Sequence, residues 1–317
     1  MAVFAKYCPE IKIYLVDIDE KKIDAWNSND IEELPVFEKG LGELIFKNRG
    51  KNLFFSTDIK NCIKAADMIF ISVNTPTKKT GFGAGYASDL KWVESSARQV
   101  AMYSKNHTIV VEKSTVPVRT AELIKKILLS SEKTAQKSKS FSIISSPEFL
   151  AEGTAIADLE NPDRVLIGGE DINSCEILSK IYERWIPKEK ILFTNLWSSE
   201  LSKITANAFL AQRVSSINAI SALCEVTGAE IKEVSNVIGS DRRIGSKFLS
   251  VSPGFGGSCF QKDILNLVYL SNYYGLNEVA KYWEQVLILN KWQRKRISKI
   301  IVDKFFGTIT SKKIVLL

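Results

Sequence analysis

Short apolar segments alternate with helical patterns along the first half of this 317-residue chain. The apolar segments are continuous, which is typical of strands that are buried on both faces of a parallel sheet. Parallel strands need crossover connections, so the alternation favours an α/β fold with a doubly wound, Rossmann-like sheet. The expected strands are 11–16, 53–56, 68–73, 108–111 and 141–144, and the expected helices are 20–27, 88–104 and 118–129.

The second half of the chain changes to long amphipathic helices. We expect one helix over 198–227, capped by Ser198 and Ser199, because serine accepts hydrogen bonds from the first backbone N–H groups of a helix. Further helices are expected over 231–238, 259–274 and 278–306. The sequence therefore predicts a mostly helical central domain after the α/β domain.

The expected domain boundaries are 1–195 for the Rossmann-like domain, 196–306 for the helical central domain and 307–317 for the start of a further domain. Residues 312–317 read as a strand that has just begun, so we expect the rest of that domain to be missing. The segment 130–140 is rich in serine and lysine and is expected to be a solvated loop.

Composition narrows the classes of function. The chain is 45% hydrophobic and 25% charged, which is ordinary for a globular protein with two domains. Its net charge of +7 is dispersed and would suit a small anionic substrate. The densest basic run, 291–296, is expected to be a solvated helix face and not a nucleic-acid site. No apolar run reaches membrane-spanning length, and no signal peptide is evident.

The chain has five cysteines, an odd number, and they are widely spaced: Cys8, Cys62, Cys175, Cys224 and Cys259. With no Cys-x-x-Cys pair, this pattern predicts reduced thiols in the cytoplasm, with no disulfide framework and no metal site. The single histidine, His107, stands at the entrance of an expected strand, and we expect it to be structural. Acid–base chemistry would then fall to Asp, Glu or Lys.

The segment 254–263, Gly-Phe-Gly-Gly-Ser-Cys-Phe-Gln-Lys-Asp, is the strongest chemical signal. It places Cys259 at the start of an expected helix, where the helix dipole and unpaired N–H groups favour the nucleophilic thiolate. Asp263 follows one helical turn later and shares a face with Cys259. A thiol beside a carboxylate suggests covalent chemistry on a carbonyl. Taken alone, the segment more often marks a buried thiol next to a turn.

Asp17 follows the first expected strand, where a doubly wound fold places the acidic residue that binds the adenosine ribose. The glycine-rich phosphate turn should lie about 20 residues earlier. No Gly-x-Gly-x-x-Gly precedes Asp17, and residues 1–7 read as the middle of the first crossover helix. We therefore expect the first strand and its phosphate loop to be absent. Asp17 could equally be only a helix cap.

Several segments together resemble the nucleotide-sugar dehydrogenases of the UDP-glucose/GDP-mannose dehydrogenase family, in the same order and spacing. They are 73–77, 112–118, 146–153, 161–169, 200–213 and 254–263. Each segment is only suggestive by itself, but six in register cover nearly the whole chain. The form Cys-Phe-Gln-Lys-Asp at 259–263 is closer to the UDP-glucose branch than to the branches that act on GDP-mannose or UDP-N-acetylmannosamine.

The resemblance implies a four-electron oxidation of the C6 hydroxyl of UDP-glucose to a carboxylate, with two NAD+. Cys259 would trap the aldehyde as a thiohemiacetal, and a second hydride transfer would give a thioester that water hydrolyses. Lys203 would stabilise oxyanions, and Asp263 would help to activate water. The remaining implied catalytic residues are Glu148, which would act in thioester hydrolysis, and Thr115 and Asn207, which would position groups or water.

The resemblance also implies binding residues. Those for NAD are Asp17, Lys22, Val73, Asn74, Thr75, Pro76, Thr77, Ser114, Thr115, Val116 and Glu152. Those for the sugar nucleotide are Glu148, Phe149, Leu150, Ala151, Glu152, Lys203, Asn207, Arg243, Ser250, Val251, Ser252, Pro253, Gly254, Phe255 and Gly256. Lys22 stands where the family often has arginine, which weakens the expectation of a bidentate contact.

A homodimer through the long helix at 198–227 is a further implication, with Phe209, Ile217, Ile220 and Leu223 among its apolar positions. A higher oligomer is compatible with it. Two other functions stay open on the sequence alone: a dehydrogenase of another nucleotide sugar, and a folded module for binding or oligomerisation that is not an enzyme. The missing phosphate turn favours the folded module that is not an enzyme. Near-native NAD+ affinity in calorimetry would argue against it.

Overall fold

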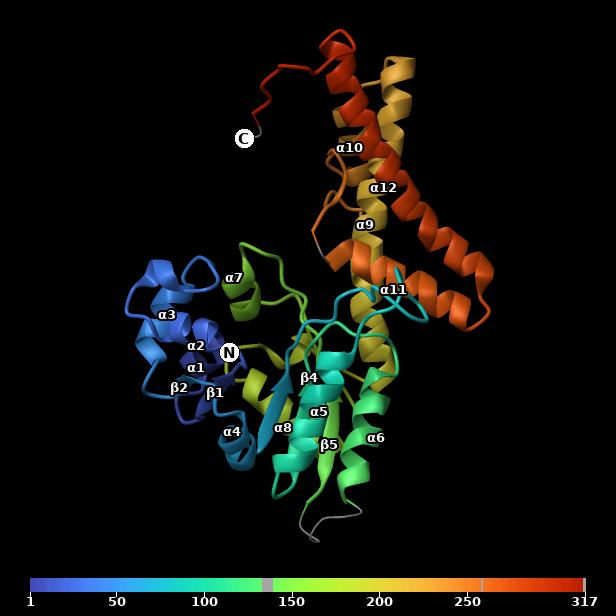
Figure 1. The fold of residues 1–317 in the computed structure, drawn as a ribbon. Helices are drawn as coiled ribbons and strands as arrows, with labels where there is room; N and C mark the ends of the chain where they lie inside the picture. The colour runs from blue at the N-terminus through green and yellow to red at the C-terminus, as the bar shows by residue number, and fades with distance from the viewer. Residues whose placement is uncertain (133–138, 258, 316–317) are drawn as a thin grey trace. The chain divides into compact units, whose positions relative to one another are not determined.

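The structure is a computed structural model that describes residues 1–132, 139–257 and 259–315. The chain forms two compact units. The first consists of Met1–Thr75 and Asp89–Lys203, and the second of Pro76–Ser88 and Ile204–Leu317. Figure 1 shows the course of the chain through both units.

The described part of the first unit contains two sheets. Strands β1 (Ile13–Val16) and β2 (Leu53–Ser56) form a parallel pair. The larger sheet runs in sequence order: β3 (Met68–Ile71), β4 (Thr108–Glu112), β5 (Phe141–Ser145), β6 (Val165–Gly169) and β7 (Ile191–Thr194). Neighbouring strands of this sheet are parallel, except that β5 and β6 are antiparallel to each other. The expected α/β fold with a Rossmann-like sheet is confirmed, and the antiparallel pair is an addition to it.

Hydrophobic side chains cover both faces of the larger sheet because successive residues of a strand point to opposite sides. In β4, Val110 packs into one core with α5 (Lys91–Tyr103) and α6 (Thr120–Glu132). Its neighbours Ile109 and Val111 pack into the other core with α8 (Ile172–Tyr182). All five residues of β4 are buried; the apolar pattern predicted this for 108–111, and the buried Glu112 is an addition. The carboxyl end of this interior strand is therefore held from both sides.

The remaining elements of the first unit are shorter. They are α1 (Ala2–Tyr7), α2 (Glu20–Asn27), η1 (Ile31–Glu33), α3 (Leu41–Asn48), α4 (Ile59–Ala65), α7 (Ala155–Glu160) and η2 (Lys188–Lys190). Aspartates cap α2, α4 and α8, where Asp19, Asp58 and Asp171 accept a backbone N–H of the first turn. The strands β6 and β7 and the helices α3, α4, α7 and α8 were not among the sequence predictions.

The described helices of the second unit are α9 (Leu196–Thr227), which begins in the first unit, α10 (Ile231–Ser240), α11 (Cys259–Tyr273) and α12 (Asn277–Lys304). Their core joins Ile204 and Ala208 of α9 to Ile264 of α11 and Trp283 of α12. The expected helices at 198–227, 231–238, 259–274 and 278–306 are confirmed to within two residues at each end.

Two local predictions are wrong. The cap of α9 is not Ser198 or Ser199: Asn195 Oδ1 accepts the Ser198 N–H at 2.7 Å, and Ser199 is buried against Ser145 of β5. Residues 312–315 form no strand, because a strand needs a hydrogen-bonded neighbour and no described segment supplies one. Residues 316–317 of that predicted strand, and 133–138 of the predicted loop, lie outside the described residues.

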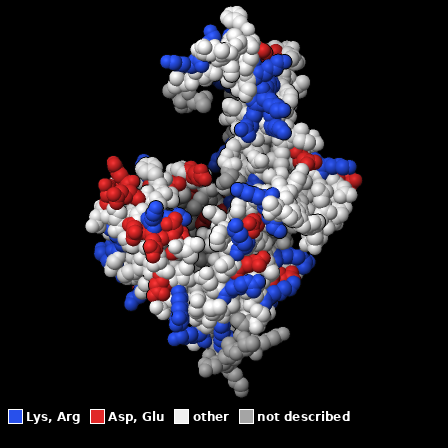
Figure 2. All heavy atoms as spheres, in the orientation of Figure 1, with Lys and Arg blue, Asp and Glu red and all other residues white. Residues whose placement is uncertain are grey.

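The basic run 291–296 is solvated only in part: Gln293 is buried, and the Arg296 side chain is 14% exposed and paired with Glu225. Lys291, Arg294 and Lys295 are exposed on α12, and Figure 2 shows lysine and arginine side chains gathered at the surface there. Within the described ranges, no helix combines the length and the apolarity that are needed to cross a lipid bilayer.

Candidate functional site

Three of the predicted catalytic residues lie together in the second unit. Cys259 is the first residue of α11, and its side chain is exposed. Asp263, one turn later, is only 2% exposed. Asn207 of α9 donates from Nδ2 to Asp263 Oδ2 at 2.6 Å, and Lys262 Nζ lies 3.9 Å from Asp263 Oδ1. An exposed thiol thus stands above a buried carboxylate whose oxygens face an amide and an ammonium group.

The predicted substrate loop, Ser250–Gly256, is held by amide side chains of two helices. Asn218 Oδ1 of α9 accepts the Ser252 N–H at 3.0 Å, and Gln293 Nε2 of α12 donates to the Ser252 carbonyl at 3.0 Å. Asn290 of α12 accepts the Phe255 N–H at 2.9 Å and donates to the Phe255 carbonyl at 3.0 Å. The loop backbone is therefore fixed by four hydrogen bonds to side chains that are themselves buried.

Gly254 is required by this arrangement. Its φ of +123° lies in the region that L-residues rarely adopt, and an added Cβ would stand 2.5 Å from Asn290 Oδ1. Sequence reasoning identified the glycine but missed Asn218, Asn290 and Gln293. A signal existed: Trp283, Val286, Asn290 and Gln293 follow one another at helical spacing, and a polar residue in an apolar stripe indicates a buried hydrogen bond.

Replacing Asn290 with alanine should destabilise the protein by about 2–3 kcal/mol, because it leaves the buried N–H and C=O of Phe255 without their partner. It should also raise the KM for the sugar nucleotide if the loop binds it. Urea unfolding and initial-rate kinetics would measure both effects. Asn236→Ala, on the exposed side of α10, is the matched control and should change neither. Equal stabilities of the two variants would contradict the role of Asn290 in holding the backbone of Phe255.

Among the described residues, Arg243 makes its polar contacts with Asp241 and none with the predicted substrate loop. Its guanidinium pairs with Asp241, with Nη2 2.6 Å from Oδ2, and the side chain is exposed. The hydrogen bond to Asp241 raises the pKa of Arg243. The loop that carries it is fixed by Arg213 of α9, which donates to the carbonyls of Ile244, Gly245 and Lys247. Arg243 is thus placed on a firm loop, with its partner in the same turn.

In the first unit, the loops after β3 and β4 are joined to each other. The Val73 N–H donates to Ser114 Oγ at 2.9 Å, and Thr75 Oγ1 donates to the Thr115 carbonyl at 2.7 Å. Both loops leave the carboxyl ends of neighbouring parallel strands, where open α/β sheets bind their ligands. The structure thus brings together two of the predicted cofactor segments, with Asn74 exposed and Val116 buried below.

Asp17 lies directly after β1, as predicted. Its Oδ1 accepts the Asp19 N–H at 3.1 Å, and Lys22 Nζ lies 3.2 Å from Oδ2. Burial opposes ionisation of Asp17, but the Asp19 N–H and the Lys22 ammonium outweigh it and hold its pKa below the usual value. The carboxylate stays charged and partly exposed, as an acceptor for ribose hydroxyls requires.

Glu148 and Phe149 follow β5. Glu148 forms an ion pair with Lys113, while the Phe149 ring lies below two cations, with Arg164 4.0 Å and Lys203 Nζ 5.2 Å from its centroid. Lys203, predicted to be catalytic, is buried and not part of a solvated helix face. Glu152 is exposed in the following turn, and Glu38 holds that turn by accepting the Gly153 N–H at 2.8 Å and the Ala155 N–H at 3.3 Å.

Two buried carboxyl groups that the sequence did not identify lie behind these loops. Glu112, the last residue of β4, is fully buried. Glu200 of α9 accepts the N–H groups of Arg119 and Ala121 at 2.7 and 2.6 Å. Burial raises the pKa of Glu112 well above the usual range, and the charge of Glu200 raises it further. Burial also raises the pKa of Glu200, to about 7.

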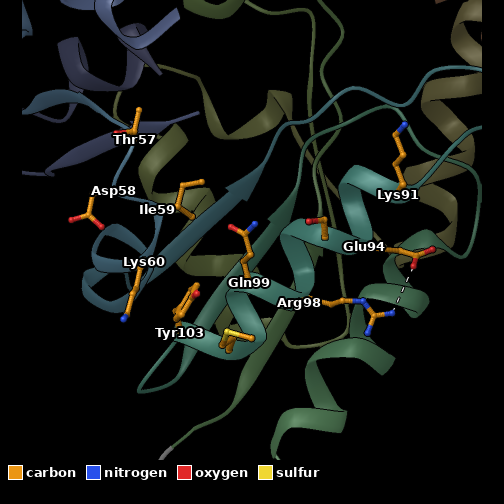
Figure 3. A pocket seen from close by; sticks show the side chains of 11 residues that line it. Thr57, Asp58, Ile59, Lys60, Lys91, Glu94, Arg98, Gln99 and Tyr103 are labelled. Atoms are coloured by element: carbon orange, nitrogen blue, oxygen red, sulfur yellow. Dashed lines mark ion pairs between the residues drawn. The ribbon is translucent and has the colours of Figure 1, made fainter. Parts of the chain in front are cut away.

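A surface hollow of about 600 Å³ lies elsewhere in the first unit, between the start of α4 and one face of α5 (Figure 3). None of the predicted site residues lines it. Arg98 pairs with Glu94, and Lys91 with Asp89, so charges of both signs meet there. This hollow is separate from the residues that carry the predicted chemistry.

Two family models of known proteins match this chain, one over its first part and one over its second part. Residues 1–186 match the NAD binding domain of the UDP-glucose/GDP-mannose dehydrogenase family, and residues 197–292 match its central domain. The chain belongs to the UDP-glucose/GDP-mannose dehydrogenase family. The UDP-glucose 6-dehydrogenase of Bos taurus is 57% identical, over 100% of this chain and 64% of the relative. UDP-glucose 6-dehydrogenase 4 of Arabidopsis thaliana is 56% identical, over 100% and 65%.

A solved structure of this family confirms the fold. The UDP-glucose dehydrogenase of Pyrobaculum islandicum superposes with a TM-score of 0.85 at 27% identity, covering 96% of this chain and 68% of that one. The chain spans about two thirds of the length of the curated relatives that it matches.

Proposed function

We propose that this chain catalyses the NAD-dependent oxidation of UDP-glucose to UDP-glucuronate. The observation that supports it most is the exposed Cys259 thiol at the first turn of α11, one turn above the buried Asp263–Asn207 pair. A nucleophile and an oriented carboxylate at this spacing suit a reaction that passes through a covalent acyl intermediate. The family membership and the names of the similar proteins point to the same substrate class.

The first oxidation removes a proton from the C6 hydroxyl and a hydride from C6, which leaves an aldehyde. Bound NAD+ would supply the hydride acceptor in this step and in the second oxidation. Asp263 receives the proton through a water molecule, and Asn207 keeps its carboxylate oriented. The Lys203 ammonium stabilises the negative charge that develops on the substrate oxygen as it loses its proton. Thr115 positions reacting groups.

Cys259 then adds its sulfur to the aldehyde carbon, and the carbonyl oxygen becomes the hydroxyl of a thiohemiacetal. Loss of a second hydride and of the hydroxyl proton gives a thioester. Water attacks the thioester carbon with help from Glu148, so that a C–O bond forms, the C–S bond breaks and the thiolate returns. Overall, UDP-glucose, two NAD+ and one water give UDP-glucuronate, two NADH and three protons.

The residues present fit the two ends of a dinucleotide. Asp17, held by Asp19 and Lys22, suits the adenosine ribose hydroxyls. The joined loops 73–77 and 114–116, with Glu152 in the turn after β5, would line the nicotinamide side. Residues 148–152, 250–256 and Arg243 would bind the sugar nucleotide. Within the loop, the N–H groups of Ser252, Gly254 and Phe255 are already donated to side chains of the protein. Residues 1–195 and 196–306 are the proposed NAD-binding and central domains.

We also propose a homodimer through α9 in the cytoplasm. Phe209, Ile220 and Leu223 are exposed apolar side chains on this helix, which favours a protein partner, whereas Ile217 is buried within the unit. The described cysteines form no disulfide, which suits a reducing compartment. A monomeric mass in sedimentation at micromolar concentration would contradict the dimer.

The proposed function predicts two NADH for each UDP-glucose consumed, because Cys259 keeps the aldehyde bound until it is oxidised again. NADH absorbance and chromatography of the sugar nucleotides would measure this ratio. A ratio of one, with an aldehyde captured by added hydrazine, would exclude the covalent route. Turnover of GDP-mannose or UDP-N-acetylmannosamine instead would indicate another nucleotide sugar. No NADH from any of them, and no heat of NAD+ binding, would indicate a module that is not an enzyme.

A further inference from the structure

The carboxyl end of β4 presents a lysine that the proposed chemistry does not use. Lys113 Nζ lies 3.0 Å from Glu148 Oε2 and donates to the Tyr182 hydroxyl of α8 at 3.2 Å. The Lys113 side chain is 12% exposed. Burial alone would lower the pKa of Lys113, but Tyr182 and Glu148 raise it above its usual value. Lys113 is therefore a cation held between two acceptors.

Glu148 is tethered at both carboxylate oxygens. Lys113 occupies one site on Oε2, and the Phe149 N–H donates to Oε1 at 3.0 Å. Each carboxylate oxygen can accept about two hydrogen bonds, so one site on each oxygen is left for water or substrate. The Glu148 side chain is 32% exposed, which leaves that edge within reach of solvent. The tether fixes the carboxylate plane without closing it off.

We propose that Lys113 is the positioning residue that aims Glu148 at the water that hydrolyses the Cys259 thioester. This inference rests on the proposed function. Lys113 directly follows β4, an interior strand whose five residues are all buried, and Tyr182 holds its ammonium by accepting a hydrogen bond. A base that is fixed before the reaction avoids the entropic cost of orienting it in the transition state.

The test is pre-steady-state kinetics of the protein with Lys113→Met, with UDP-glucose and NAD+ in excess over the protein. Both hydride transfers precede hydrolysis, so we expect a burst of two NADH per site, followed by turnover slowed about 100-fold. Intact-mass spectrometry should detect the acyl adduct on Cys259. Glu148→Gln should give the same adduct, and the double variant should be no slower than the slower single variant, because both substitutions remove one function.

Tyr182→Phe keeps the ring and removes only the second acceptor of Lys113, so it should slow hydrolysis several-fold with a smaller adduct signal. It also keeps the test decisive if Lys113→Met does not fold. Lys125→Met is the matched control, because it removes an exposed ion pair with Glu170 and should behave as the wild type.

The outcomes separate the two proposals. If Glu148→Gln accumulates the adduct while Lys113→Met and Tyr182→Phe turn over normally, the positioning role is wrong and the function stands. If Lys113→Met loses NADH formation without any burst or adduct, its role is structural and the inference is also wrong. If the wild-type protein forms no NADH from UDP-glucose, the proposed function fails and takes this inference with it.

Discussion

Replacing Cys259 with alanine is expected to abolish the formation of UDP-glucuronate, with a fall in turnover of at least about 10⁴-fold. Without the thiol no thiohemiacetal can form, so the aldehyde cannot be held for the second oxidation. Any residual first oxidation should release one NADH and an aldehyde that hydrazine captures. The measurements are NADH absorbance and quantification of the captured aldehyde. Alkylation of Cys259 in the wild-type protein should have the same effect on product formation.

The control for this prediction is Cys62→Ala, a partly buried thiol on α4 that lies outside the proposed site. It should retain full activity. Because the Cys259 side chain is exposed, its removal should change the free energy of unfolding by less than about 0.5 kcal/mol. Lost activity with unchanged stability would then be a chemical effect. Normal production of UDP-glucuronate by Cys259→Ala would refute the covalent route.

The sequence identified the residues whose relation is local. Cys259 and Asp263 share a face of α11 because four residues make about one helical turn, and the structure confirms that α11 begins at Cys259. Asp17 and the loops after β3 and β4 were placed at strand ends by the same kind of reasoning. Continuous apolar segments predicted the buried strands β4 and β5 for an equally local reason, because both faces of these strands are covered. The same pattern overstated the burial of β1, where Tyr14 and Val16 are exposed.

Contacts between distant segments could not be predicted in this way. The Lys113–Glu148 pair spans 35 residues and depends on β4 and β5 being neighbours in register. The antiparallel placement of β6 likewise depends on packing, whereas the true cap of α9, Asn195, is a local contact that the sequence reading missed. Ser199 resembled a cap in the sequence, but β5 recruits its hydroxyl. Polar residues that look ordinary in the sequence gain a role only when burial removes water as their alternative partner.

Glu112 is the residue for which that loss of water should matter most. Both of its carboxyl oxygens are buried, and among the residues that the structure describes neither has a hydrogen-bond partner at good geometry; the Ser114 N–H lies near enough to lower the pKa of Glu112 slightly. Burial, then the charge of Glu200, raises its pKa, and Lys113 opposes this only in part. The folded protein therefore keeps this proton at pH values where the unfolded chain has lost it. The contribution of Glu112 to the free energy of unfolding is at its maximum below about pH 4.5 and is lost progressively as the pH rises.

Glu112→Gln should consequently become more stable relative to the wild type as the pH increases. The amide keeps the shape of the protonated acid and cannot ionise. We expect the two proteins to differ little at pH 5, and the variant to be more stable by about 2–3 kcal/mol at pH 8. Urea unfolding across this range would measure the difference. Taking the difference cancels the titration of every other group, provided that the substitution leaves their pKa values unchanged.

Glu200 has to be considered together with Glu112, because a negative charge on either carboxyl raises the free-energy cost of ionising the other. With a pKa near 7, Glu200 adds its own loss of stability between about pH 4.5 and 7 in the wild type. Removing the charge of Glu112 should ease the ionisation of Glu200, which enlarges the advantage of Glu112→Gln at high pH. Glu176→Gln, which replaces an exposed carboxyl on α8, is the control. If Glu112→Gln and Glu176→Gln differed from the wild type by the same constant amount at every pH, Glu112 would not be holding a proton in the fold.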